Sequence, residues 1–408
     1  MPPRPPLGRD FRLYAAGRAV SNVGDRVALI ALVFLVVHLS AGSAPALALF
    51  YVCRLLPRIR GGLVAGLVVD HVDRRRLMLA CDIVRAVLLA LVPAATSSGW
   101  WTIYPTVFVL YALTLLFDTA ASAALPDVVP ESRMTTANAV LNGLGQASDV
   151  FYALGGVLIF TFGYRVPFFI DAVTFAFSAL MVAVMRLPKT AHDGAAAPGQ
   201  MIQRIRVGIS FIREQPFLKW SALTFALAPF AGGIAFVLTP LYANHALAGT
   251  PHLVGPLRSG AFRFSVLEVV LGAGALLGSA ASVRLAARWP RGRLFGLGLS
   301  GMGVSEALLA LTHNLYVVCP ILVIDGIFNG VFFVAGMTLT QTLTPSEMRG
   351  RVLAANQTLA NSALALGSAC SGALLLKLSY PQLWLVAGVI IELASLFVWL
   401  RPEVRSQA

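Results

Sequence analysis

The chain has 408 residues, of which 58% are hydrophobic and only 12% are charged, and its formal net charge is +13. Soluble proteins carry about 25% charged residues, so this composition excludes an ordinary soluble domain. The basic excess is spread along one side of the apolar segments without interleaved aromatic residues, which argues against a nucleic-acid partner.

Apolar segments follow one another along almost the whole chain. The runs 27–53, 86–117 and 220–257 contain no Asp, Glu, Lys or Arg, and each exceeds the ~20 residues of a membrane crossing. Lipid offers the backbone no hydrogen-bond partners, so such segments must be helical. We therefore predict an all-α integral membrane protein with twelve transmembrane helices, near 14–39, 45–69, 77–97, 102–124, 138–162, 166–187, 218–244, 262–286, 294–312, 315–340, 355–378 and 381–400.

A polar stretch separates these helices into two groups of six. We expect an N-terminal six-helix half over 1–187, a cytoplasmic linker over 188–216 and a C-terminal six-helix half over 217–408. The linker has isoleucines at helical spacing beside arginines, which predicts an amphipathic helix on the inner membrane surface. These isoleucines are Ile202, Ile205, Ile209 and Ile212.

The two halves carry similar motifs at nearly equal separations. A glycine pair that begins at Gly62 recurs at Gly274, and 274 − 62 is 212 residues. A proline followed by acidic and basic residues recurs from Pro130 to Pro345, and 345 − 130 is 215 residues. Near-equal offsets of unrelated motifs indicate a duplication, as in transporters built from parallel six-helix repeats around a site at the bilayer midplane.

Lysine and arginine are concentrated on one side of the predicted helices. The loops of the other side hold only Arg165, Arg258, Arg263 and Lys377. The positive-inside rule then places both termini and the linker in the cytoplasm, and the protein in the inner (cytoplasmic) membrane. We expect no cleaved leader, because the first apolar segment lacks a small-residue cleavage site.

The sequence offers no enzyme chemistry. The four cysteines lie in apolar segments without metal-ligand spacing, so we expect neither a disulfide framework nor a metal site. We find no G-x-x-x-x-G-K phosphate loop and no nucleophile arrangement, so we expect no cofactor and an energy source other than ATP.

One loop combines glycines, an acid and a basic triplet. Gly62 and Gly66 are four residues apart, so they share a helix face that would let a second helix approach closely. Asp70 stands where the apolar run stops. The basic triplet before the next apolar run is Arg74, Arg75 and Arg76.

This loop resembles the signature loop between the second and third helices of major facilitator superfamily transporters. His71 replaces a basic residue of that signature, and Asp73 replaces a glycine. The resemblance implies a gating role for the loop. The alternative is an ordinary cytoplasmic loop that obeys the positive-inside rule.

An ordered set of further motifs runs along nearly the whole length. It comprises Asp10-Phe11-Arg12-Leu13, Ser21-Asn22-Val23-Gly24-Asp25, Asp82 with Arg85, Ala124 to Pro130, Asp171 with Thr174, and Gln341 to Arg351. The set resembles the bacterial exporters related to macrolide-efflux proteins and siderophore (enterobactin) exporters. One difference is that Phe151 and Tyr152 stand where many antiporters have the Gly-Pro of a G-P-x-x-G-G motif.

Half of the 18 acidic residues lie inside predicted helices. An acid at the bilayer centre costs about 3 kcal/mol or more unless it is paired, protonated or hydrated. Function therefore explains part of this set, and structural ion pairs such as Asp82 with Arg85 explain the rest. The nine are Asp25, Asp82, Asp118, Asp149, Asp171, Glu268, Glu306, Asp325 and Glu392.

The resemblance implies a central cavity lined mainly by the first, fourth, seventh and tenth helices. Asp25, Asp118 and Asp325 lie on three of these helices and Asp149 on the fifth, so these four acids are our proton-coupling candidates, Asp25 first. The arginines inside helices are candidates for counter-ions of these acids or for binding an anionic substrate group. The alternative is that their side chains extend to the membrane surface. These arginines are Arg18, Arg26, Arg54 and Arg58.

Aromatic residues of the seventh and tenth helices are candidates for lining a substrate pocket, although such residues more often serve packing or lipid contact. They are Phe225, Phe230, Phe236, Phe328 and Phe332. We therefore predict a monomeric secondary transporter that exports a small amphipathic molecule, such as a drug, an antibiotic or a siderophore-like metabolite. Proton antiport and alternating access would drive it. The alternatives are a metabolite importer or facilitator of the same fold and a non-transporting membrane sensor or partner.

Overall fold

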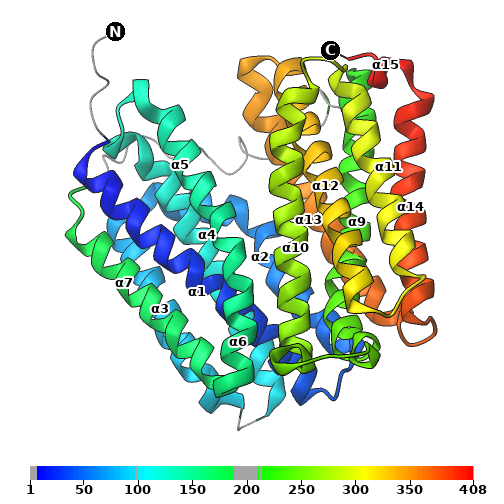
Figure 1. The fold of residues 1–408 in the computed structure, drawn as a ribbon. Helices are drawn as coiled ribbons and strands as arrows, with labels where there is room; N and C mark the ends of the chain where they lie inside the picture. Colours follow the sequence, from blue (N-terminus) through cyan, green and yellow to red (C-terminus); the bar gives the residue numbers. More distant parts are fainter. Residues whose placement is uncertain (1–6, 97–98, 188–209, 211–213, 408) are drawn as a thin grey trace. The chain divides into compact units, whose positions relative to one another are not determined.

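The computed structural model describes residues 7–96, 99–187, 210 and 214–407 (Figure 1). Every regular element within these residues is helical. Nine helical segments among them are long and apolar enough to cross a membrane. The predicted all-α membrane class is therefore confirmed.

Contacts between residues divide the chain into two compact units. The N-terminal unit comprises 1–35 and 56–196, and the C-terminal unit comprises 36–55 and 197–408. The end of the first helix and the start of the second thus group with the C-terminal unit. Our domain boundaries at 187 and 217 stay a prediction, and the expected linker helix with its isoleucines lies outside the described residues.

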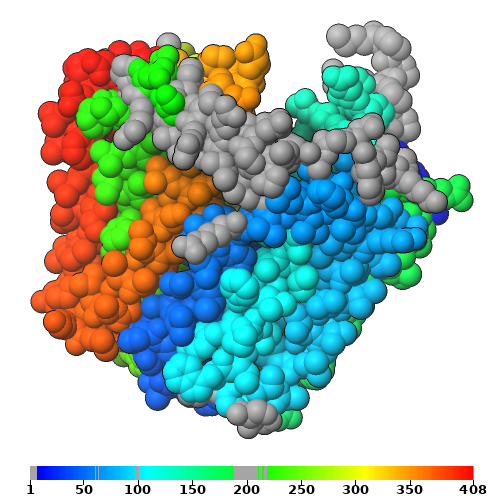
Figure 2. All heavy atoms as spheres, turned by 180° about the vertical axis from the view of Figure 1, so that it is seen from behind, coloured from blue at the N-terminus to red at the C-terminus, as the bar shows by residue number. Residues whose placement is uncertain are grey.

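The first six crossings follow the predicted order. In the N-terminal unit α3 packs against α4 and α7, and α1 lies along α6 and α7 (Figure 1). Seen from behind, α3 and the start of α4 lie side by side on the surface (Figure 2). The elements are α1 Arg9–Leu39, α2 Ala44–His71, α3 Arg74–Ala95, η2 Trp100–Thr102, α4 Ile103–Val128, η3 Glu131–Arg133, α5 Met134–Ala147, η4 Ser148–Phe151, α6 Tyr152–Phe162 and α7 Arg165–Val184.

The other long helices belong to the C-terminal unit. There α12 packs against α10 and α11, and α9 packs against α13 and α14. The elements are α9 Pro216–Asn244, η5 Ala246–Gly249, η6 Gly255–Arg258, α10 Gly260–Leu285, α11 Arg291–Leu309, α12 Leu315–Leu343, α13 Ser346–Leu374, α14 Tyr380–Leu400 and α15 Pro402–Arg405.

Two elements differ from the prediction. The helix expected over 138–162 is interrupted by the tight turn η4, although neither glycine nor proline stands there. The helix expected to begin at 355 begins at Ser346, directly after Pro345. Its first turns are polar, so a search for apolar runs does not detect them, whereas a proline before the first turn is a common start of a helix.

The repeated glycine pair behaves differently in the two units. A Cβ at Gly274 or Gly278 of α10 would overlap the carbonyl oxygens of Val323 and Ile327, so α10 and α12 touch through their backbones. No atom of the described residues lies within 4 Å of where a Cβ would stand at Gly62 or Gly66. The close approach that their spacing predicts therefore stays a prediction.

The membrane topology can be tested at the two ends of α11. Leu311, after its last residue, is 77% exposed, and Trp289, before its first residue, is 47% exposed. In a variant whose four native cysteines are replaced by alanine, we expect Leu311→Cys to react with a membrane-impermeant thiol reagent in intact cells. Trp289→Cys should react only after the cells are opened. The reverse pattern would contradict the predicted cytoplasmic termini.

Candidate functional site

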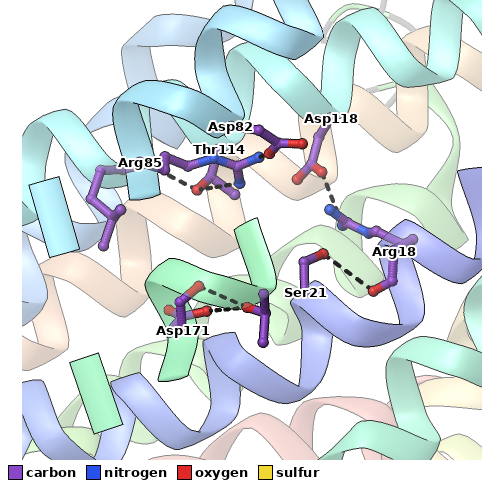
Figure 3. Close-up of polar contacts among 9 residues, drawn as sticks. Arg18, Ser21, Asp82, Arg85, Thr114, Asp118 and Asp171 are labelled. Atoms are coloured by element: carbon purple, nitrogen blue, oxygen red, sulfur yellow. Dashed lines mark hydrogen bonds and ion pairs between the residues drawn. The ribbon is translucent and has the colours of Figure 1, made fainter. Parts of the chain in front are cut away.

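Asp171 of α7 lies directly against α1. A Cβ at Gly24 would overlap the carboxylate of Asp171 and the hydroxyl of Thr174, so glycine is required for this approach of the two helices. The Asp171 side chain is 1% exposed, and its Oδ1 accepts a hydrogen bond of 2.8 Å from the Thr174 hydroxyl (Figure 3). Asp171 therefore lies beside the first-choice acid Asp25, the residue that follows Gly24.

Asp82 and Arg85 of α3 form a completely buried ion pair. Their side chains are 0% and 1% exposed, and Arg85 also donates to the Thr114 hydroxyl of α4 at 3.4 Å (Figure 3). The guanidinium lies 4.7 Å from the ring centre of Phe117 and 4.1 Å from that of Phe175. This arrangement fixes the cation among α3, α4 and α7, and it favours a structural role for the pair.

Two further ion pairs join α1 to its neighbours. Arg18 contacts Asp118 of α4 at 2.9 Å, and Arg26 contacts Asp149 of η4 at 2.7 Å. The four side chains are one quarter to one third exposed. Arg26 also lies 5.3 Å from the ring centre of Tyr152. The interrupted helix thus presents Asp149 to α1, and η4 marks a place where the backbone departs from α-helical geometry.

Asp25 is half-buried and makes no ion pair with a described residue. The charged groups that act on it most strongly are Arg85, Arg18 and Arg26, followed by Asp118. The charge of Asp25 acts in turn on Asp82 and Asp171. We call these groups together with Asp149 the N-terminal charge network; it comprises the acids Asp25, Asp82, Asp118, Asp149 and Asp171 and the cations Arg18, Arg26 and Arg85.

The other two arginine candidates lie apart from this network. Arg54 belongs to the C-terminal unit, with its guanidinium 6.0 Å from the ring centre of Tyr51. Arg58 is exposed and makes no ion pair with a described residue. The structure thus gives acidic partners to Arg18 and Arg26, and the counter-ion or substrate role of Arg54 and Arg58 stays a prediction.

Two arginines of the basic triplet, Arg74 and Arg75, bind the ends of neighbouring helices. Arg74 contacts Asp127 of α4 at 3.0 Å and donates to the Ala123 carbonyl at 3.0 Å. Arg75 donates to the carbonyls of Val182, at 3.2 Å, and Ala183 in the last turn of α7. Cations at these carboxyl-terminal helix ends match the negative end of each helix dipole.

Two acids flank the same loop in different ways. Asp73 caps α3, because its Oδ1 accepts a hydrogen bond of 2.8 Å from the backbone N–H of Arg76. Asp70 is exposed and forms no ion pair with a described residue. The acid that meets Arg74 is therefore Asp127, and the role of Asp70 in gating stays a prediction.

Asp325 belongs to α12 of the C-terminal unit, where it is 6% exposed, and its charge acts on Glu306 of α11. The five aromatic candidates belong to the same unit, and most of them pack against other rings or helices. Phe225, Phe295 and Phe332 form a cluster with ring centres 5.0 to 6.0 Å apart.

The remaining aromatic candidates also have packing partners. Phe328 lies against Gly301, and Phe236 lies 5.2 Å from Tyr51 between ring centres. The backbone of Phe230 touches Gly367 of α13. This favours the packing alternative for most of them, and a substrate pocket at these residues stays a prediction.

Sequence reasoning did not select Asp171, Asp127 or Glu306 as site residues. Asp171 and Glu306 were recognisable only as acids inside apolar helices, and Asp127 only as part of the motif before Pro130. The glycine next to Asp25 was the one local signal that another helix approaches there.

Comparison with known proteins gives a consistent assignment. Residues 5–407 match the family described as "Transmembrane secretion effector", a family of the major facilitator superfamily. The MFS-type transporter YfiS of Bacillus subtilis is 26% identical over 95% of this chain and 92% of its own length. Macrolide efflux protein A of Streptococcus pyogenes is 23% identical over 96% and 95%, and the multidrug efflux pump Tap of Mycobacterium bovis is 26% identical over 87% and 84%.

The solved structures agree on the fold. The nucleoside transporter NupG matches with a TM-score of 0.75 over 97% of this chain and 99% of its own, at 11% sequence identity. At that identity the likeness concerns the fold alone. It confirms the predicted all-α membrane fold of the major facilitator type, and the division into two six-helix halves stays a prediction.

The buried ion pair can be tested by a double-mutant cycle. Arg85→Leu leaves the Asp82 carboxylate unpaired in an apolar interior, so we expect it to lower the free energy of unfolding in mixed micelles by about 3–5 kcal/mol. Asp82→Leu together with Arg85→Leu should recover most of this loss. Arg12→Gln, on an exposed part of α1, is the control and should change stability by less than about 0.5 kcal/mol. Equal losses in the single and double variants would show that the charge pair contributes little.

Proposed function

Because the chain belongs to the transmembrane secretion effector family of the major facilitator superfamily, we propose that it exports a small amphipathic molecule in exchange for protons that move inward. It is a multi-pass membrane transporter and not an enzyme. The proposed location is the cytoplasmic membrane, with both termini inside the cell and the monomer as the working unit.

The names of two relatives support the proposed substrate class. Two of them carry the names macrolide efflux protein and multidrug efflux pump, and both match this chain over most of its length. Macrolides and many other drugs are bulky molecules with large apolar surfaces. We therefore propose outward transport of compounds of this kind, with an antibiotic, another drug or a siderophore-like metabolite as the physiological cargo.

The observation that carries the proton mechanism is the imbalance of the N-terminal charge network. It contains five acids but three arginines, inside helices long and apolar enough to span a membrane. Asp82, Asp118 and Asp149 each contact an arginine, whereas Asp25 and Asp171 form no ion pair with an arginine among the described residues. A proton is the smallest charge that can balance an unpaired acid in lipid.

A transport cycle follows from these contacts. Protonation of Asp25 removes one negative charge that acts on Arg18 and Arg26, whose own partners lie on α4 and η4. The pairs between α1 and these elements then hold α1 more firmly, and loss of the proton loosens them. Alternating access of the two six-helix halves would couple this change to substrate movement.

Asp25 is the first residue to test. Asp25→Asn mimics the protonated acid, so it should abolish uphill efflux while leaving downhill exchange measurable. Everted membrane vesicles report this directly: in the wild type, addition of erythromycin or ethidium should raise the pH of the acidified lumen. In Asp25→Asn the lumenal pH should not change.

The other candidates and a control complete that experiment. Asp118→Asn and Asp149→Asn, which lose an ion pair, and Asp325→Asn should each reduce proton-driven efflux. Glu131→Gln, at an exposed acid of η3, should not. If all four candidate acids can be replaced without loss of uphill efflux, the coupling groups lie elsewhere. If a protonophore leaves wild-type efflux unchanged, the antiport proposal is wrong.

The same vesicles separate the alternative functions. An importer would accumulate the probe in the opposite direction, and a sensor would neither move the probe nor release lumenal protons. No observation on this chain favours either alternative over export.

Gating can be tested at Asp70. This exposed acid follows the glycine-rich end of α2, and we propose that it forms contacts on the cytoplasmic side in only one of the two access states. Asp70→Asn should therefore lower the turnover of erythromycin transport at least several-fold, with protein level and erythromycin binding nearly unchanged. The matched control is Asp73→Asn, which keeps an N-cap and should transport normally. Full transport by Asp70→Asn would contradict a gating role.

A further inference from the structure

Glu306 of α11 and Asp325 of α12 lie at about the same level of two packed helices in the C-terminal unit. The two helices run in opposite directions and are packed closely, because a Cβ at Gly298 would meet Phe332 and a Cβ at Gly301 would meet the ring of Phe328. One further turn along this register brings Glu306 level with Asp325. The charge of Asp325 acts directly on Glu306.

Both carboxyl groups are buried and incompletely bonded. Each side chain is 6% exposed. Glu306 Oε2 and Asp325 Oδ1 are both without a hydrogen-bond partner among the described residues. A buried carboxylate oxygen without a partner loses its hydration and gains nothing in return, so these two atoms point to an occupant that protein atoms do not supply.

The arginines of the surrounding helices are not available to this pair. Arg263 of α10 is committed to backbone carbonyls, with hydrogen bonds of 2.7 Å to Ala243 and to Leu257. The arginines of α11 lie in its first turn, those of α13 lie in its first two turns, and Arg284 lies in the last turn of α10. The other titratable side chains of these helices are Glu268 on α10, Tyr316 and Cys319 on α12, Glu347 and Cys370 on α13, and Tyr380 and Glu392 on α14.

The position of Glu306 adds a second reason against a free negative charge. It lies in the last turn of α11, where the carbonyl groups form the negative end of the helix dipole. The nearby acid of α14 increases the repulsion, since Glu392 lies against Gly303, one turn before Glu306.

We infer that Glu306 and Asp325 form a proton-binding pair in the C-terminal unit, which holds one proton between the two carboxyl groups and releases it in the other access state. The bound proton lets the O–H of one carboxyl group donate to the oxygen of the other, which satisfies an otherwise unpartnered atom. The pair is separate from the N-terminal charge network, because it lies on α11 and α12 and contains no arginine.

A proton suits this pair better than a metal ion. No group of three or more His, Cys, Asp or Glu side chains in the described part of the chain is arranged to hold a metal. Ca²⁺ takes about six to eight oxygen ligands and Mg²⁺ about six, whereas a proton needs only two oxygens. By the predicted topology, the last turn of α11 lies toward the outer side, from which protons would enter.

The coupling of this proton to export rests on the proposed function, but its binding can be measured without any substrate. Purified full-length protein in lipid nanodiscs is brought from about pH 6 to about pH 9, and infrared difference spectra record the C=O band of protonated carboxyl groups. The wild type should lose this band as the pH rises. Glu306→Gln and Asp325→Asn should each remove the same part of the change.

A pH-indicator titration counts the protons. The double variant Glu306→Gln with Asp325→Asn should release about one proton per molecule fewer than the wild type. Glu347→Gln, at an exposed acid of α13, should alter only the signal of an ordinary surface carboxylate. Glu306→Asp keeps a carboxyl group and should shift the titration midpoint, which preserves the test if the glutamine variant does not fold.

The outcomes are distinct. If the variants show the same infrared change and the same proton count as the wild type, the proposed pair is wrong. A carboxyl band that persists at every pH would also contradict it, because a permanently neutral pair exchanges no proton. If the pair titrates as expected but efflux ignores a protonophore, the export mechanism fails while the site stands. If efflux needs the proton gradient but the pair does not titrate, the proton-binding pair is wrong and the export mechanism stands.

Discussion

The cost of placing charge in hydrocarbon is the constraint on which this structure depends. Lipid supplies neither water nor counter-ions, so each ionised group in the apolar helices must find its partner within the protein. Arg85 has several such partners. It forms an ion pair with Asp82, donates a hydrogen bond to Thr114 and contacts two aromatic rings. One residue thereby links three helices, and the geometry of the N-terminal unit follows from satisfying it.

Glycine allows the helices to come close enough for such contacts. Gly24 brings α1 onto the Asp171 carboxylate, and Gly274 and Gly278 bring α10 onto the backbone of α12. Close approach excludes lipid and water from the groups between the helices, which strengthens every electrostatic interaction there. The acids that remain without a cation after this packing are then the groups at which a proton has the greatest effect.

The two units meet this constraint in different ways. In the N-terminal unit, three of the five acids of the charge network pair with arginines, and Asp25 and Asp171 form no ion pair with a described residue. In the C-terminal unit, the buried acids Glu306 and Asp325 lie at about the same level of two helices that pack through glycines and aromatic rings. A duplicated architecture thus carries two different electrostatic solutions, and protonation can change the charge of each unit separately.

The sequence by itself determined that the chain is a membrane-embedded bundle of twelve helices, because apolar segments of this length can satisfy their backbone in lipid only as helices. It also located the intramembrane acids and arginines along the chain. Only the tertiary structure decided which groups meet. Arg26 pairs with Asp149, 123 residues away, and Asp127 rather than Asp70 meets Arg74. Such pairings depend on the rotation and register of packed helices, and on a break such as η4, which no local pattern in the sequence encodes.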